Sequence, residues 1–200
     1  MHTFVKNVRA FRRHVATEPG SFTRLTDGQT PRALFISCSD SRVMPALITG
    51  ARPGELFELR TVGGMVPDHR PDRPSSEAAT VEYAVAVLRV PDIVVCGHSH
   101  CAAVGAMTRH EDLSATPAVR DWLARTSPAP SSVNPTTPTT PDLSAAVQEH
   151  VVRQLGRLRG HPSVSRRIAA GRLRLHGWFY ELATGSVLVH RPESKVFLPL

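Results

Sequence analysis

A short apolar run that ends in reactive side chains constrains the fold of this chain more than any other feature. Residues 33–36 have the length and composition of a buried strand. The polar residues that follow include Cys38, Asp40 and Arg42. Open α/β sheets build their sites at the carboxyl ends of their strands. This segment therefore predicts a buried strand that delivers a thiol, a carboxylate and a guanidinium to one edge of a sheet.

The same layout occurs a second time further along the chain. Residues 93–96 form another short apolar run, a glycine breaks it, and His98 and Cys101 follow directly. Strand patterns that alternate with helical patterns indicate a mostly parallel sheet. Because the carboxyl ends of parallel strands share one edge, Cys38 and His98 are expected to lie close together. Cys96 lies inside the predicted strand, so we interpret it as a core residue.

Helical and strand patterns cover much of the remaining chain. Apolar residues recur at helical spacing in 3–16, opposite a basic face, and indicate a helix that docks on its own core or on a partner subunit rather than on a membrane. Residues 55–60 alternate as a strand, and 173–182 with 187–190 indicate a terminal hairpin. A helix over 77–88, capped by Ser75 or Ser76, is expected to bury Ala79, Tyr83, Ala86 and Val87.

The second half of the chain contains two further helical patterns and one low-complexity segment. Residues 126–142 are rich in proline and threonine and predict a flexible surface loop, not a domain boundary. Asp142 or Ser144 is expected to cap a helix, and another begins at 161–168. The buried stripe expected on the first of these helices is Val147, Val151, Leu155 and Leu158. Together the patterns predict a single α/β domain over residues 1–200, with a mostly parallel central sheet flanked by helices, an N-terminal helical arm and a C-terminal hairpin.

Composition excludes several classes of protein. The net charge is +7, but the basic residues are spread along the chain, which argues against nucleic-acid binding. No apolar run approaches the roughly 20 residues of a membrane span, and the N-terminal residues lack the pattern of a signal peptide, so we expect a cytoplasmic protein without a membrane partner. Three cysteines are too few for a disulfide framework, and in the cytoplasm such residues are more often metal-binding or catalytic.

The candidate site combines donors from both strand ends. His98 and Cys101 offer a nitrogen and a sulfur at short spacing, which suits zinc, and Cys38 would be the third ligand. Three protein ligands leave open the fourth position that is typical of a catalytic zinc. Asp40 and Arg42 are close enough in sequence to form a bidentate ion pair. Alternatively, Asp40 could be a fourth zinc ligand, which would close the site to water.

Two motifs in this chain resemble the signature of the β-class carbonic anhydrases. They are residues 38–42, Cys-Ser-Asp-Ser-Arg, and residues 97–101, Gly-His-Ser-His-Cys. Further matches to the family pattern occur at 53–57, Arg60, 82–85 and 176–180, followed by Thr184 and Gly185.

The resemblance implies a zinc lyase that reversibly hydrates carbon dioxide to bicarbonate and a proton by means of a zinc-bound hydroxide. Carried over by position, the zinc ligands are Cys38, His98 and Cys101. Asp40 would orient the hydroxide while paired with Arg42. Members of the family are homodimers or multiples of dimers, so the N-terminal helix would serve as an arm across the subunit interface.

Two alternative functions are compatible with the same residues. Relatives with the same zinc ligands hydrolyse carbon disulfide or carbonyl sulfide. A non-catalytic zinc or bicarbonate-binding module would be expected to lose Asp40 or Arg42 first, and both are present. The residues that carry protons to and from the site are not identified by any motif; His69, His100 and His110 are candidates because histidine titrates in the right range.

Overall fold

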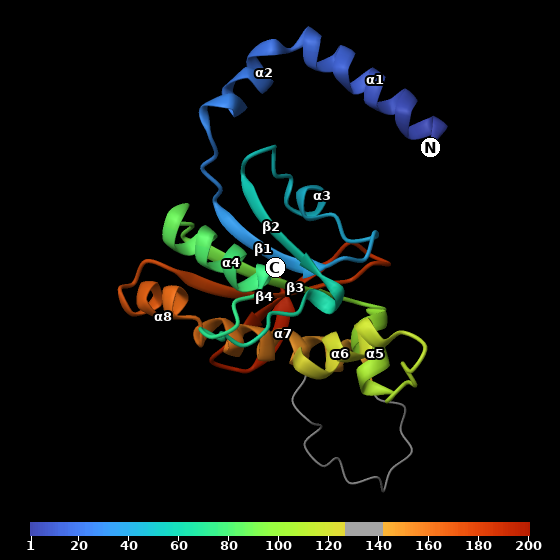
Figure 1. Ribbon diagram of the computed structural model, residues 1–200, viewed down its shortest axis with the longest axis vertical. Helices are drawn as coiled ribbons and strands as arrows, with labels where there is room; N and C mark the ends of the chain where they lie inside the picture. The colour runs from blue at the N-terminus through green and yellow to red at the C-terminus, as the bar shows by residue number, and fades with distance from the viewer. Residues whose placement is uncertain (127–141) are drawn as a thin grey trace, which may run out of the picture.

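A six-stranded sheet in the order β2-β1-β3-β4-β5-β6 forms the centre of the computed structural model (Figure 1). The structure describes residues 1–126 and 142–200. The first four strands in this order run parallel, and the last two continue the sheet in antiparallel fashion. The strands are β1 (Ala33–Cys38), β2 (Leu56–Thr61), β3 (Asp92–His98), β4 (Arg174–Tyr180), β5 (Val187–Arg191) and β6 (Val196–Pro199).

The parallel part of the sheet confirms the predicted fold class. β1 is buried along its whole length and pairs with β2 on one side and β3 on the other. Strands covered on both faces are near-continuous apolar runs, as residues 33–36 are. The observed strand is two residues longer than this run and carries Cys38 to its end. The predicted hairpin is present as β4 and β5, whereas β6 was not predicted.

Helices flank the sheet on both sides of the ligand-bearing strands (Figure 1). The α-helices are α1 (His2–Thr17), α2 (Pro19–Thr23), α3 (Pro45–Thr49), α4 (Ser76–Glu82), α5 (Ala102–Thr108), α6 (Pro117–Thr126), α7 (Leu143–Arg159) and α8 (Pro162–Ala169), and the other helical turns are η1 (Arg24–Asp27), η2 (Val62–Gly64) and the π-turn η3 (Tyr83–Val87). No helix in residues 1–126 or 142–200 combines the length and apolar character that a membrane crossing requires.

Helix α7 packs closely on the sheet, and two glycines occupy the strand positions beneath it. A Cβ atom added to Gly97 would lie 2.6 Å from Val147 Cγ1 and 2.7 Å from Val151 Cγ2. A Cβ added to Gly177 would lie 3.0 Å from Val151 Cγ1. Asp142 caps the helix by accepting from the Ser144 N–H, and the four predicted stripe residues are all buried.

The buried face predicted for the helix after Ser75 is wrong. Ser75 does cap α4, by accepting from the Ala78 N–H. However, the side chains expected to be buried are exposed, with Tyr83 at 46% and Val87 at 59%. The buried residues are Ala78, Val81, Ala84 and Val85. Both faces of this segment are apolar, so spacing alone does not identify the core side, and the π-turn shifts the phase of the second half.

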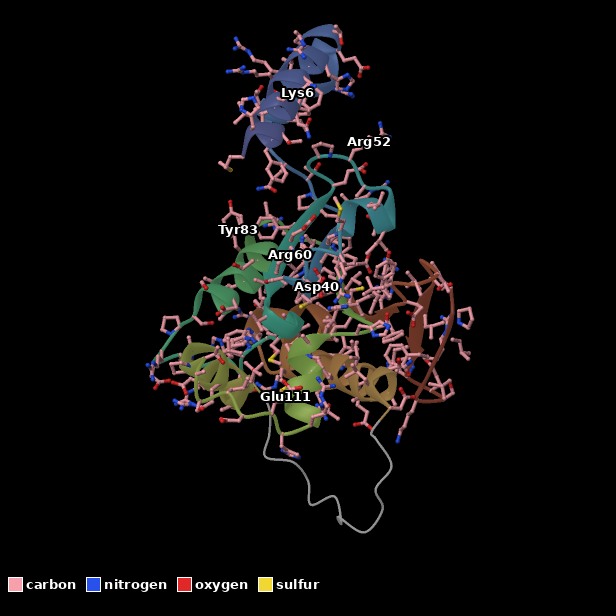
Figure 2. The ribbon with its side chains drawn as sticks, turned by 90° about the vertical axis from the view of Figure 1, so that its right-hand side faces the viewer. Lys6, Asp40, Arg52, Arg60, Tyr83 and Glu111 are labelled. Carbon is pink, nitrogen blue, oxygen red and sulfur yellow. The ribbon has the colours of Figure 1, made fainter. Side chains whose placement is uncertain are left out.

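The amphipathic N-terminal helix is present as α1, but it does not dock on the chain's own core. It stands apart from the sheet in both views (Figure 1, Figure 2). Its apolar side chains Phe4, Val8 and Phe11 are 70%, 66% and 55% exposed. Of the predicted loop 126–142, residues 127–141 lie outside the described residues. Helix α6, just before it, was not predicted, and the single-domain assignment stays a prediction.

Candidate metal centre

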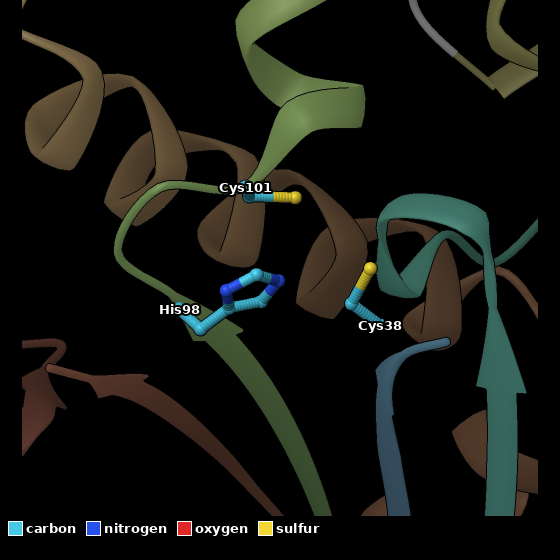
Figure 3. Close-up of side chains that lie close together, drawn as sticks. All are labelled: Cys38, His98 and Cys101. Atoms are coloured by element: carbon cyan, nitrogen blue, oxygen red, sulfur yellow. The ribbon is translucent and has the colours of Figure 1, made fainter. Parts of the chain in front are cut away.

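The three residues predicted as zinc ligands meet at the carboxyl ends of β1 and β3. The strand order reverses at this pair, because β2 lies on one side of β1 and β3 on the other. Open α/β sheets bind ligands at such a switch point. The Sγ atoms of Cys38 and Cys101 and a ring nitrogen of His98 all lie within 4.8 Å of one another, and all three residues are buried (Figure 3).

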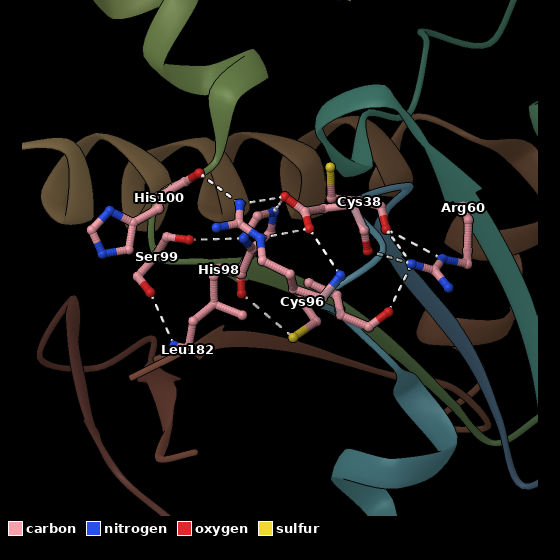
Figure 4. Close-up of polar contacts among 11 residues, drawn as sticks. Cys38, Arg60, Cys96, His98, Ser99, His100 and Leu182 are labelled. Carbon is pink, nitrogen blue, oxygen red and sulfur yellow. Dashed lines mark hydrogen bonds and ion pairs between the residues drawn. The ribbon is translucent and has the colours of Figure 1, made fainter. Parts of the chain in front are cut away.

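The hydrogen bond of His98 leaves one of its ring nitrogens free for a metal. His98 Nδ1 lies 2.8 Å from the carbonyl oxygen of Ser99 (Figure 4). Because a carbonyl oxygen only accepts, Nδ1 carries the ring proton and donates a hydrogen bond to this oxygen. Nε2 then presents a lone pair, and it is buried without a hydrogen-bond partner in the described part of the chain. Ser99 is fixed in turn, since its hydroxyl donates to Glu181 Oε1 and accepts from the Leu182 N–H. A free imidazole nitrogen beside two sulfurs is a donor set that fits zinc.

The two cysteine sulfurs shift each other's pKa in opposite directions. The neighbouring Cys101 thiol lowers the pKa of Cys38, against the opposing effect of burial. The neighbouring Cys38 sulfur and burial raise the pKa of Cys101 far above its ordinary value. A divalent cation would offset the repulsion between two thiolates and allow both to bind it.

Asp40 and Arg42 form the predicted bidentate pair beside these donors. Arg42 Nε donates to Asp40 Oδ1 over 2.9 Å, and Nη2 donates to Oδ2 over 2.6 Å. The guanidinium and the Arg42 backbone N–H hold the pKa of the Asp40 carboxyl well below its usual range. Asp40 Oδ2 lies 4.0 Å from His98 Nε2. The site therefore contains an ionised carboxylate next to the three donors.

Arg60 holds the turn on which Cys38 and Asp40 lie. Its guanidinium donates to the carbonyl oxygens of Cys38, Asp40 and Val43, the last two at 2.8 and 2.7 Å (Figure 4). Three carbonyls bound by one planar cation fix the path of the turn. The sequence identified Arg60 only as part of the family pattern, and this contact with the turn was not predicted.

The other candidate residues lie around the site or away from it. Cys96 is buried in the core as predicted, and burial raises its pKa to about 12. His100 has an exposed side chain and a left-handed backbone (φ 57°), and its carbonyl accepts from Arg42 Nη2 at 3.3 Å. The His69 ring packs against that of His161, 5.5 Å between centroids. Proton transfer by His69, His100 or His110 stays a prediction.

Comparison with known proteins identifies the family of this chain. The family model described as carbonic anhydrase matches residues 33–187. A carbonic anhydrase from Pseudomonas aeruginosa is 46% identical over 181 residues, covering 90% of this chain and 82% of that protein. Carbonic anhydrase 1 from Escherichia coli O157:H7 is 42% identical, again over 90% of this chain and 82% of that protein.

Solved structures give the same result at the level of the fold. The β-carbonic anhydrase CcaA superposes with a TM-score of 0.90 at 34% identity, covering 100% of this chain and 99% of that chain. One of two tetrameric β-carbonic anhydrases from Sordaria macrospora has a TM-score of 0.77 at 28% identity, covering 94% and 95%. The chain therefore belongs to the carbonic anhydrase family of enzymes, and its fold is that of the β class.

Proposed function

We propose that this chain is a zinc enzyme that reversibly hydrates carbon dioxide to bicarbonate and a proton. The observation that carries the proposal is the buried Cys38, His98 and Cys101 donor set, with the ionised Asp40 beside it. The family supports the activity, since the relatives at 42–46% identity are carbonic anhydrases. When bound, zinc would lower the pKa of a water ligand toward neutrality and so supply hydroxide as the nucleophile.

The chain's own residues would orient the attacking oxygen. An ionised carboxylate can only accept hydrogen bonds, and Arg42 keeps Asp40 ionised. An oxygen nucleophile that donates its hydrogen to Asp40 must direct a lone pair elsewhere, toward the substrate carbon. Arg42 is itself held by the His100 carbonyl, so the pair has a fixed orientation. We also propose a second, closed arrangement in which Asp40 leaves Arg42 and becomes the fourth zinc ligand.

Metal analysis and stopped-flow hydration assays test these roles together. The wild-type chain should bind one zinc and hydrate carbon dioxide. Cys101→Ser should lose zinc, whereas Cys96→Ser, a cysteine in the core, should keep it. Asp40→Asn should keep zinc and lose hydration by about 10²- to 10⁴-fold. A fully loaded wild-type protein that does not hydrate carbon dioxide would refute the enzyme assignment. X-ray absorption at the zinc edge, compared between the wild type and Asp40→Asn, distinguishes water from Asp40 as the fourth zinc ligand.

The same assays separate the two alternative functions. Turnover of carbon disulfide or carbonyl sulfide faster than hydration would identify the hydrolase. Zinc binding with no turnover of any of the three substrates would indicate a binding module.

We further propose that the chain assembles through α1 into homodimers or multiples of dimers. Helix α1 exposes Phe4, Val8 and Phe11, and η3 exposes Tyr83 and Val87. Apolar faces that are exposed in one subunit can be buried against a second subunit in a dimer. The Sordaria macrospora proteins are described as tetrameric, which agrees with such an assembly. A cytoplasmic location is also proposed, because free cysteines are stable in a reducing compartment.

A further inference from the structure

The loop of residues 61–66 lies directly against Cys38. The Ser39 N–H donates to the Thr61 carbonyl oxygen over 2.9 Å, and a Cβ added to Gly64 would lie 3.2 Å from the Cys38 backbone nitrogen. Gly63 and Gly64 have φ values of +77° and +63°, a left-handed conformation that glycine adopts without strain. The loop therefore packs against the backbone that carries the Cys38 sulfur.

Trp122, on α6, binds the peptide unit between Val62 and Gly63 in this loop. Its indole Nε1–H donates to the Val62 carbonyl oxygen over 2.9 Å. Trp122 therefore fixes the position of the loop from α6.

Two buried side chains one turn apart on α7 bind the same loop from the other side. The Val66 N–H donates to Gln154 Oε1 over 2.9 Å, and Gln154 Nε2 lies 3.5 Å from His150 Nδ1. His150 Nε2 lies 3.0 Å from the Gly63 carbonyl oxygen. Because Gln154 accepts through its oxygen, its amide nitrogen donates to His150 Nδ1. The imidazole proton is then on Nε2, which donates to Gly63.

The burial of His150 and Gln154 indicates that the role of both side chains is to hold this loop. The two side chains are 3% and 0% exposed, and a buried polar group without a partner is costly. Their hydrogen bonds in the described chain go to the loop or to each other. Burial also lowers the pKa of His150 to about 4, so at neutral pH the ring has the uncharged form that this hydrogen-bond chain requires.

We propose that Trp122 and His150 are positioning residues of the metal centre, which hold the loop of residues 61–66 against the backbone of the ligand Cys38. The inference rests on the proposed function, since it takes the site to hold zinc. Outer contacts that orient a metal ligand tune the affinity of a site and the electronic properties of the bound metal. Removing either contact should therefore change the metal–sulfur bond without removing a ligand.

The first test is Trp122→Phe in the full-length chain loaded with Co²⁺ in place of zinc. This variant loses the indole N–H but keeps an aromatic ring. We expect the thiolate-to-cobalt absorption band to shift, and the Co²⁺ affinity measured by chelator competition to fall about 10- to 100-fold. Trp178→Phe is the matched control, because Trp178 packs against Phe35 in a different cluster and should leave both readouts unchanged.

The second test compares His150→Gln with His150→Leu. A glutamine Nε2 can replace the imidazole Nε2 as donor to Gly63, so His150→Gln should keep Co²⁺ affinity within a few-fold, whereas His150→Leu should lose it like Trp122→Phe. Equal losses in both His150 variants, or an unchanged cobalt band and affinity in Trp122→Phe, would overturn the proposal. If His150→Leu does not fold, Trp122→Phe decides alone. A wild-type chain that binds neither Co²⁺ nor zinc would instead refute the proposed function, and the positioning roles with it.

Discussion

Replacing Gly97 by alanine should destabilise the protein by closing the narrow space between β3 and α7. The added methyl would lie 2.6 and 2.7 Å from side-chain methyls of Val147 and Val151, where ordinary contacts are 3.4–4 Å. Valine has one strongly preferred rotamer in a helix, so neither methyl can turn away without strain. The remaining response is a shift of the helix or the strand.

Overpacking of this kind costs about 1–3 kcal/mol of unfolding free energy. For a chain of this size, that corresponds to a fall in melting temperature of roughly 2–12 °C. Urea unfolding measures this cost in free energy directly. The protein concentration must be the same for both proteins, because association also contributes to stability. The midpoint should fall while the slope of the transition stays constant.

Gly156→Ala is the matched control for this substitution. Gly156 lies on the exposed side of α7, and nothing lies within 4 Å of a Cβ built there. Alanine should stabilise the helix at that position by about 0.5–1 kcal/mol. Combining Gly97→Ala with Val151→Ala should cost less than the sum of the two changes, because the second removes one of the two clashes. A Gly97→Ala protein as stable as wild type would refute the close packing of α7 on the sheet.

Three further predictions follow from other contacts. Because burial lowers the pKa of His150 to about 4, the unfolded chain binds an extra proton between about pH 6.5 and pH 4; unfolding free energy should fall as the pH drops through this window, and less steeply in His150→Gln when urea midpoints are compared. Arg42→Gln should raise the pKa of Asp40 toward its ordinary value near 4, measured by ¹³C NMR of the carboxyl, and an unchanged pKa would contradict the role of the ion pair. Deleting residues 1–17 should reduce the number of subunits per assembly, calculated from the mass measured by light scattering, whereas an unchanged number of subunits would rule out α1 as the interface arm.

The positions of the predicted metal ligands could be inferred because their signals are local. Cys38 and His98 each end an apolar strand, and parallel strands bring such ends to one edge whatever the rest of the chain does. The pairing of Asp40 with Arg42 is likewise a contact between near neighbours in sequence.

The residues that surround the ligands were missed because their contacts are distant in sequence. His150 is 87 residues from Gly63, and Trp122 is 60 residues from Val62. A buried histidine within an apolar stripe resembles any other helical position until the loop opposite it is known. The buried face of η3 was misassigned because this segment has two apolar faces, and the spacing of its apolar residues does not tell which of them is buried.

The complete burial of β1 also bears on how fast a bound metal ion could leave. Native proteins open first where hydrogen bonds are exposed, and last at interior strands. Cys38 lies at the end of a strand that is buried throughout and paired on both sides. Local fraying would therefore rarely release this ligand. We expect the residence time of the ion to approach the lifetime of the folded state. The rate of metal exchange in vitro would then report the rate of global unfolding.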